Sequence, residues 1–114
     1  LAFIEKEQIL DKVNADALFI KAELEALKQK HALIGDIRGI GLLWGIELVK
    51  NRQTKEKAIE EAEMVLYECL SNGLSFKVSQ GNVLQLSPPL TISRQQLKEA
   101  IAIVDAAIAK AMGK

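Results

Sequence analysis

The chain has 114 residues, 49% of them hydrophobic, and its 15 basic side chains balance its 15 acidic ones. This length and composition predict one domain, residues 1–114, whose core needs no disulfide or metal. The neutral charge balance argues against nucleic acid as a partner, and no apolar stretch is long enough to span a membrane. The single Cys69 suits the reducing environment of a cytoplasmic protein.

The N-terminal third predicts a long helix. The chain begins with Leu1, followed by three apolar residues, without Met or a capping residue, which predicts a fragment cut inside a helix. Farther on, apolar residues recur at the alternating spacing of a one-sided helix: Leu10, Val13, Ala17, Ile20, Leu24 and Leu27. The opposite, polar side is predicted to carry Asp11, Lys12, Asp16, Lys21, Glu25 and Lys28. Periodicity leaves open whether residues 1–8 continue this helix or form a separate one.

Two extended segments are predicted at 34–38 and 42–49. Alternation places four large residues on one face of the second segment, namely Leu42, Trp44, Ile46 and Leu48. The other face takes Leu43, Gly45, Glu47 and Val49. Gly39 and Gly41 predict a bulge or tight bend between them, and the charged stretch 50–57 predicts a solvated loop and the start of a helix.

The second half predicts a helix, two strands and a final helix. The helix over 58–70 ends at Asn72-Gly73, and a turn containing Gly81 joins strands at 74–78 and 82–86. Pro88 and Pro89 then form a stiff corner, and Ser93 caps the last helix. The order α-ββ-α-ββ-α predicts an α+β sandwich: a small, largely antiparallel sheet of about four short strands, with helices packed on one face.

The residues alone predict no catalytic, cofactor-binding or metal site. The glycines at 35–41 do not form a phosphate loop, because a strand and not a helix follows them. Asp36 and Arg38 share one strand face and are interpreted as a structural pair or a contact to a neighbouring domain, with ligand binding as the less favoured alternative. His31 suits the dipole at a helix C-terminus, Cys69 suits the core, and Trp44 suits the core or a partner interface.

Two segments carry a resemblance to a known family. Residues 34–49 read IGDIRGIGLLWGIELV, and residues 86–93 read LSPPLTIS. The first resembles the GD-V-R-G-x-G-L-x-x-G-I-E-L-V signature of class III aminotransferases, in particular their 4-aminobutyrate, ω-amino acid and ornithine group. The second resembles the PPLxIt segment of the same family, followed by the expected closing helix. Together these motifs cover nearly the whole chain.

The resemblance implies the C-terminal small domain of a fold-type I enzyme that depends on pyridoxal phosphate. The cofactor and the lysine that binds it then belong to a large domain that is not present in this chain. The expected reaction moves an amino group from an amino acid or ω-amino donor to a 2-oxo acid. The small domain is expected to close the active site, within a cytoplasmic homodimer.

Gln85 is the one substrate-adjacent residue that the resemblance implies. Several members of the family have at this position an Arg that binds the substrate α-carboxylate, whereas Gln offers only a neutral amide. Three explanations stay open, in this order: a preference for amines or ω-amino acids, another Arg in its place, or drift of the gene. The alternatives for the chain as a whole are a free-standing ligand-binding or dimerisation module and a decarboxylase or aminomutase of the same family. A severed domain is expected to expose Leu43, Val49 or Val83 as an apolar patch, whereas a free-standing module is expected to have a polar outer sheet face.

Overall fold

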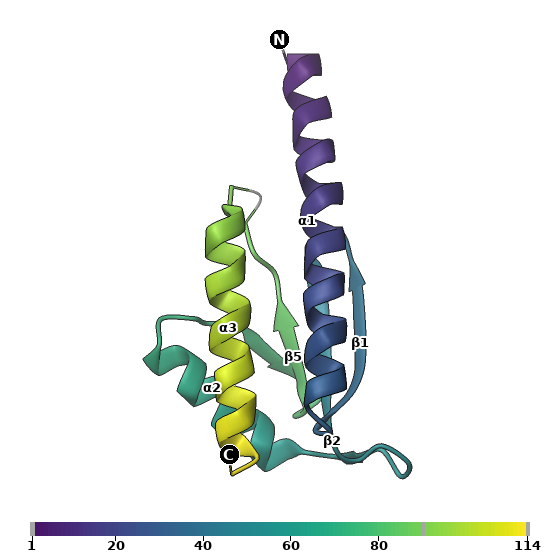
Figure 1. Cartoon of the computed structure of the whole chain (residues 1–114), viewed down its shortest axis with the longest axis vertical. Helices are drawn as coiled ribbons and strands as arrows, with labels where there is room; N and C mark the ends of the chain where they lie inside the picture. Colours follow the sequence, from purple (N-terminus) through teal and green to yellow (C-terminus); the bar gives the residue numbers. More distant parts are fainter. Residues whose placement is uncertain (1, 90, 114) are drawn as a thin grey trace.

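The computed structural model describes residues 2–89 and 91–113, which form three helices packed on a small sheet (Figure 1). The elements follow the predicted order, with one short strand added. In chain order they are α1 (Ala2–Lys30), β1 (Ile34–Ile40), β2 (Leu43–Asn51), β3 (Glu56–Lys57), α2 (Ile59–Ser71), β4 (Lys77–Ser79), β5 (Val83–Leu86) and α3 (Arg94–Ala111). The predicted α+β class is confirmed. β3 lies within the stretch that was expected to be a solvated loop.

The sheet is antiparallel throughout, in the strand order β1-β2-β5-β4, and β3 pairs with the far end of β2. β1 and β2 form a hairpin in which Ile40 pairs with Leu43, so Gly41 and Leu42 make the turn. The bend was predicted between Gly39 and Gly41 and lies one step later, because Gly41 is the residue with a positive φ of 56°.

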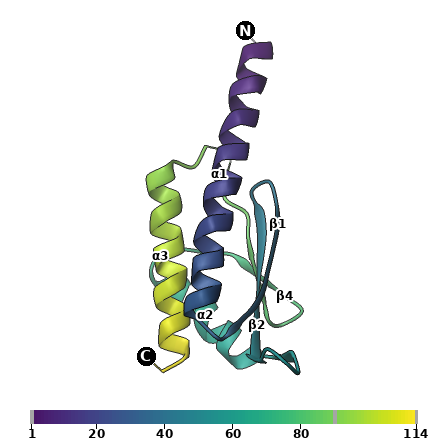
Figure 2. The ribbon, with the colours of Figure 1, turned by 45° about the vertical axis from the view of Figure 1, so that its right-hand side comes forward.

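α1 is one continuous helix from Ala2, which answers the question about residues 1–8 for all but Leu1, a residue outside the described part of the chain. Its N-terminal part projects beyond the sheet, whereas the rest runs beside α3 (Figure 2). Ile20, Leu24 and Leu27 are buried as predicted, but Leu10 is 61% exposed. The stripe therefore begins later than predicted, because the first turns have no layer of this chain beneath them. Among the described residues, no helix is both long and apolar enough to cross a bilayer.

Local chemistry explains where the other two helices begin and end. α2 ends at Ser71 with Asn72 as its C-cap, and Gly73 takes the left-handed conformation with φ of 87°, as predicted. α3 begins after Ser93, whose hydroxyl accepts a hydrogen bond from the Gln96 amide at 3.1 Å. The Gln96 side chain in turn accepts one from the Ser93 amide at 3.0 Å, so the predicted capping box is confirmed.

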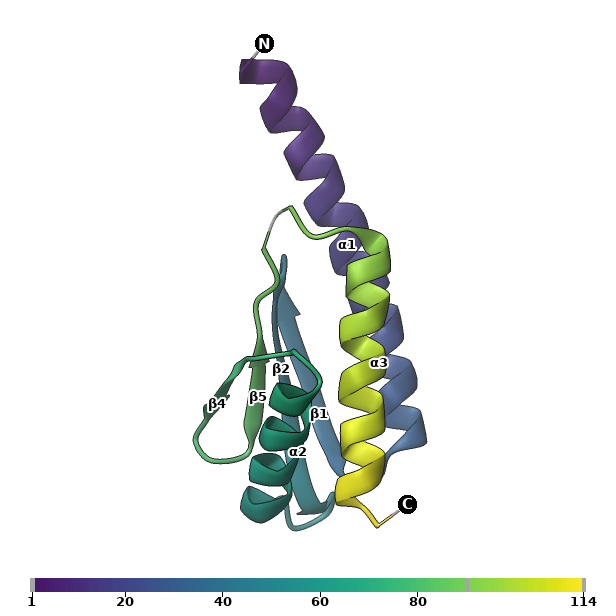
Figure 3. The same cartoon turned by 90° about the vertical axis from the view of Figure 1, so that its left-hand side faces the viewer.

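The two faces of the sheet differ in what covers them. The helix face packs into one core with residues of all three helices, on the same side of the sheet (Figure 3). It carries Trp44, Ile46 and Leu84, which are buried. The other face, here called the open face, carries mainly polar and charged residues in register: Asp36, Arg38, Gly45, Glu47, Ser79, Lys77, Val83 and Gln85.

The open face carries less exposed apolar surface than the sequence predicts for a severed domain. Leu43 is exposed as expected, but Val49 and Val83 are buried. Each of these two valines packs beside a glycine: a Cβ on Gly35 would lie 2.7 Å from Val49 Cγ2, and one on Gly45 would lie 3.3 Å from Val83 Cγ1. The glycines leave room for the valines to lie close to the sheet, so the expected apolar patch is wrong at these two positions.

Candidate functional site

A cavity of about 600 Å³ opens where β5 ends and the chain turns toward α3. Its lining comes from α1, the start of β2, residues 74–77, the end of β5 with the residues after it, and α3. Most of the lining side chains are apolar. Lys77 is the one charged side chain among the described residues that line it, and Gln85, Ser75 and Ser87 add neutral polar groups. The cavity therefore suits a small organic molecule with an anionic group.

Pro88 and Pro89 form part of the cavity wall. β5 ends at Leu86, and the two prolines follow after Ser87. Because proline fixes φ and lacks an amide donor, this segment leaves the sheet without a ladder partner. The interpretation of these residues as interface or structural residues stays a prediction. In the structure both prolines line the cavity.

Gln85 lies on the open face and borders two hollows. Across the sheet it is paired in register with Gly45 on β2 and with Lys77 on β4. Besides the first cavity it lines a shallower hollow of about 450 Å³, which also involves Arg38 and Gln80. Since Gly45 has no side chain, no side chain of β2 stands directly opposite Gln85 in the register. Its predicted role next to a substrate stays a prediction.

Asp36 and Arg38 also lie on the open face, but they interact weakly. The Arg38 guanidinium is 3.9 Å from the Asp36 carboxylate and 3.9 Å from that of Glu47, and its side chain is 63% exposed. Exposed pairs at such distances contribute little to stability. Asp36 instead accepts a hydrogen bond of 2.9 Å from the Ile37 amide. Arg38 therefore has a side chain that is free to contact another body.

The sequence did not predict that His31 is buried and pairs with an acidic residue of α3. His31 is 1% exposed, and its Nε2 lies 2.6 Å from Asp105 Oδ1 on α3. Lys30 Nζ donates to the other oxygen of Asp105 at 2.9 Å. Burial alone would raise the pKa of Asp105, but the hydrogen bonds from His31 and Lys30 outweigh it and hold that pKa below its usual value. Because His31 and Asp105 are 74 positions apart in the sequence, no local signal predicts this contact.

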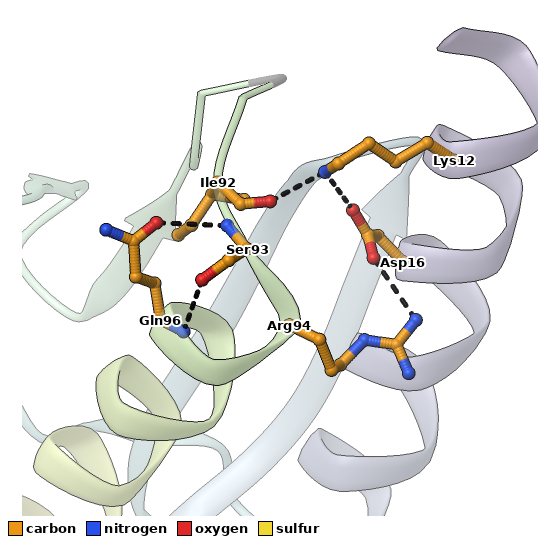
Figure 4. A network of polar contacts seen from close by, with 6 residues as sticks. All are labelled: Lys12, Asp16, Ile92, Ser93, Arg94 and Gln96. Atoms are coloured by element: carbon orange, nitrogen blue, oxygen red, sulfur yellow. Dashed lines mark hydrogen bonds and ion pairs between the residues drawn. The ribbon is translucent and has the colours of Figure 1, made fainter. Parts of the chain in front are cut away.

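Asp16 was predicted on the polar side of α1, and this is wrong: it is only 4% exposed (Figure 4). One of its oxygens accepts from Lys12 Nζ at 2.6 Å and the other from Arg94 Nη2 at 3.2 Å. Lys12 Nζ also donates to the Ile92 carbonyl at 2.7 Å. Burial alone would raise the pKa of Asp16, but these two cations outweigh it and lower that pKa. α3 covers Asp16 because α1 and α3 lie side by side, which periodicity within one helix does not reveal.

The thiol of Cys69 is not activated as a nucleophile. Cys69 is buried in the core as predicted, and burial, followed by the nearby Glu68, raises the pKa of its thiol to about 11. Among the described residues, no group of three or more His, Cys, Asp or Glu side chains is placed to hold a metal ion.

The residues present do not make a pyridoxal phosphate site. That cofactor needs a lysine for its aldehyde and a charged partner for its ring nitrogen. Lys77 lines the 600 Å³ cavity, but no second charged residue lines it within the described part of the chain. The exposed Lys77 also has no carboxylate opposite it in the register, where Gln85 stands. No reaction step on the cofactor is therefore assigned to residues of this chain.

Known relatives and solved structures resemble nearly the whole chain. It is 59% identical, over 94% of its length, to an (R)-1-hydroxy-2-aminoethylphosphonate ammonia-lyase of Vibrio splendidus, of which it covers 22%. It is 40% identical, over 93% of its length, to a leucine/methionine racemase of Thermococcus litoralis, of which it covers 24%. A solved aminotransferase from Bacillus anthracis superposes on 96% of the chain with a TM-score of 0.78 and 34% identity, and 26% of that structure is covered.

The chain thus spans less than a quarter of the length of these two curated relatives. The family model described as aminotransferase class-III matches residues 1–108. The relatives include a lyase and a racemase as well as aminotransferases, so the match determines the family and not one reaction. The chain belongs to the class-III aminotransferase family.

Proposed function

We propose that this chain is the C-terminal small domain of a pyridoxal-phosphate-dependent enzyme that acts on a small ω-amino compound with an anionic group at its other end. The observation that carries the proposal is Gln85. It stands where the resemblance leads to an Arg, and it borders the 600 Å³ cavity together with Lys77. The cofactor is held by the rest of the protein, and the full-length enzyme is a homodimer.

Gln85 and Lys77 favour a substrate whose charge is distant from its amino group. A neutral amide offers no planar cationic fork to a carboxylate beside the reacting amine. Lys77 offers a flexible point charge at the edge strand, which attracts a phosphonate or carboxylate without requiring one geometry. This combination supports the preference for ω-amino compounds, of which 4-aminobutyrate is one example, over α-amino acids.

The domain contributes binding and exclusion of water. The apolar lining of the cavity, with Trp44 on β2 and Pro88 at the corner, closes over a bound molecule from one side. Closing such a site strengthens the electrostatic interactions inside it and protects reactive intermediates from water. The cofactor, when bound to the rest of the enzyme, supplies the electron sink.

Two reactions fit this substrate class, and each has support. Transfer of the amino group to a 2-oxo acid follows from the family resemblance and from the aminotransferase structure that superposes on this chain. Elimination of ammonia is favoured by the 59% identical relative, whose named substrate carries a terminal amine and a phosphonate. We therefore rank ammonia elimination from a hydroxylated aminoalkylphosphonate first and amino transfer second.

The two reactions differ in whether an acceptor is needed. We expect the purified full-length protein to release ammonia from (R)-1-hydroxy-2-aminoethylphosphonate without any 2-oxo acid. An aminotransferase would instead consume the amine only in step with an added acceptor such as 2-oxoglutarate or pyruvate. Ammonia and residual acceptor are measured in the same reactions. Turnover of α-amino acids in preference to every ω-amino compound would contradict the proposed substrate class.

The role of Gln85 is tested in the same enzyme. Gln85→Arg is expected to raise the ratio of kcat/KM for α-amino over ω-amino substrates by about ten-fold, the equivalent of about 1.4 kcal/mol for a charged hydrogen bond. Lys77→Met is expected to raise KM for the anionic amine, and Lys98→Met on α3 is the matched control, because Lys98 is exposed and does not line the cavity. An unchanged ratio in Gln85→Arg would exclude this side chain from substrate recognition.

A further inference from the structure

We propose that Lys12 and Asp16 of α1 are positioning residues that hold the chain after the Pro88-Pro89 corner and thereby set the position of one cavity wall. Pro88, Pro89 and Ile92 all line the 600 Å³ cavity. They belong to neither a helix nor a strand. Their position therefore depends on what holds the segment, and α1 supplies that contact from far away in the sequence. The kinetic part of this inference rests on the proposed function, whereas the structural part does not.

Lys12 makes the contact that ties the segment to α1. Its Nζ donates at 2.7 Å to the Ile92 carbonyl, across 80 residues of sequence. Within the segment itself, the Ile92 amide donates to the Pro89 carbonyl at 3.1 Å. Proline has no amide, so the two prolines offer no donor through which the sheet could hold them. The Lys12 bond is thus a polar tie between this local turn and a helix, in addition to the packing of Ile92 against the core.

Asp16 orients Lys12 and connects it to the start of α3. Its carboxylate accepts from Lys12 at 2.6 Å and from Arg94 at 3.2 Å, with both oxygens used (Figure 4). The Arg94 guanidinium also lies 4.3 Å from the centre of the Phe19 ring, a cation–π contact to α1. A carboxylate as buried as Asp16 is rare unless it is paired. Through these pairs α1 contacts the chain at two points, the Ile92 carbonyl through Lys12 and the Arg94 guanidinium through Asp16.

The network contrasts with the ion pair between α3 and α2. Lys110 and Glu68 join α3 to α2 at 3.0 Å, but both side chains are considerably more exposed than Asp16 and neither touches the segment after the corner. Lys12 has a side chain that is 40% exposed, so replacing it leaves the core intact. These two lysines provide a matched pair of variants: one holds the segment, and the other forms an ion pair elsewhere.

The structural part is tested by amide hydrogen exchange in the full-length protein. In Lys12→Met we expect exchange at the Ile92 and Ser93 amides, which are hydrogen-bonded to Pro89 and Gln96, to become about ten-fold faster or more, because the turn opens more often once its tie to α1 is lost. Lys12→Arg keeps a donor at this position and is expected to restore much of the protection. Lys110→Met is expected to leave these two amides unchanged.

The kinetic part uses the same variants with the ω-amino substrate that the enzyme prefers. Lys12→Met is expected to lower kcat/KM by between about 10-fold and 100-fold, mainly through KM, since the wall contributes binding in ground and transition states alike. A general loss of folded protein would lower kcat and leave KM unchanged. Lys12→Arg is expected to recover KM.

Two results would overturn the inference. One is unchanged exchange at the Ile92 and Ser93 amides in Lys12→Met, which would mean that the lysine does not hold the segment. The other is faster exchange with KM unchanged, which would mean that the segment moves without shaping the site. A protein that turns over no ω-amino compound contradicts the proposed function, and in that case the exchange experiment still decides whether Lys12 positions the segment.

Discussion

The two faces of the sheet use the same strands for different purposes. On the helix face, residues such as Ile46 and Leu84 are fully buried beneath three helices. On the open face, Arg38, Lys77 and Gln85 keep contact with solvent, and the glycine at position 45 leaves space beside Gln85. In a strand, neighbouring residues point to opposite faces, so one residue of β5 holds the fold while the next is free for recognition. The polar groups of the candidate site are therefore separable from the fold by mutation.

The largest effect is expected from Leu84→Ala on β5. Leu84 has no exposed surface, and removing its side chain should cost about 2–5 kcal/mol of unfolding free energy, because the cavity left behind adds to the lost burial. Gln85→Ala, the adjacent residue on the open face, should change stability by less than about 0.5 kcal/mol. Urea unfolding of the 114-residue chain measures both. Similar losses for the two variants would contradict the division of labour between the faces.

A smaller but pH-dependent effect is expected from Asp16→Asn. Because the folded state holds the pKa of Asp16 below 3.8, the unfolded state takes up a proton first as the pH falls. The stability that the carboxylate contributes is therefore present above about pH 3.8 and is lost as the pH falls through the lower, folded pKa. At neutral pH we expect the variant to be about 1.5–3 kcal/mol less stable than the wild type, and the difference should shrink in acid. A difference that stays constant down to pH 2 would exclude this linkage.

Gly39 and Gly45 of the β1–β2 hairpin provide the next comparison. A Cβ on Gly39, on the helix face, would lie 2.1 Å from Cδ2 of the Trp44 ring, so Gly39→Ala must displace the ring and should cost about 1–3 kcal/mol. On the open face, a Cβ on Gly45 would lie 3.3 Å from Val83 Cγ1 and 3.8 Å from the Arg38 carbonyl oxygen, and the valine side chain can move. Gly45→Ala should therefore cost less. Equal losses of unfolding free energy in the two variants would show that the Trp44 ring can move aside at little cost.

The smallest effect is expected from Arg38→Ala. Its two carboxylate contacts are at 3.9 Å and its side chain is mostly in solvent, so the change in unfolding free energy should stay below about 0.5 kcal/mol. The same substitution in the full-length enzyme tests whether Arg38 contacts another domain. A loss of unfolding free energy above about 1 kcal/mol in the isolated chain would mean that side chains of the open face also stabilise the fold.

Patterns local in sequence predicted most of the fold. The capping box at Ser93, the helix end at Gly73 and the alternation along β2 depend on residues within a few positions of one another, and each is confirmed. Contacts between distant segments were beyond the reach of such patterns. Asp16 looked like a surface residue because nothing in α1 reveals that Arg94 of α3 lies against it. β3 was missed because its two residues, both charged, pair only with the far end of β2.

The sequence predicted where the candidate site lies but not which distant segments line it. The Pro88-Pro89 motif and its strand indicated the end of β5, where the cavity is found. The lining from α1 and from residues 74–77 depends on tertiary packing, and so does the register that sets Lys77 opposite Gln85. Val49 and Val83 were assigned to the surface from alternation alone, which does not account for the space that a neighbouring glycine leaves.

The position of Trp44 makes its fluorescence sensitive to both hollows. It is the one tryptophan in the sequence, its ring rests over Gly39, and its Nε1 donates to the Gly41 carbonyl at 2.8 Å. The residue borders both hollows, the one beside the proline corner and the one on the open face. An indole at such a boundary changes its emission when either side loses water. The intrinsic fluorescence of this chain therefore reports, without any label, on a ligand entering one hollow and on a protein surface covering the other.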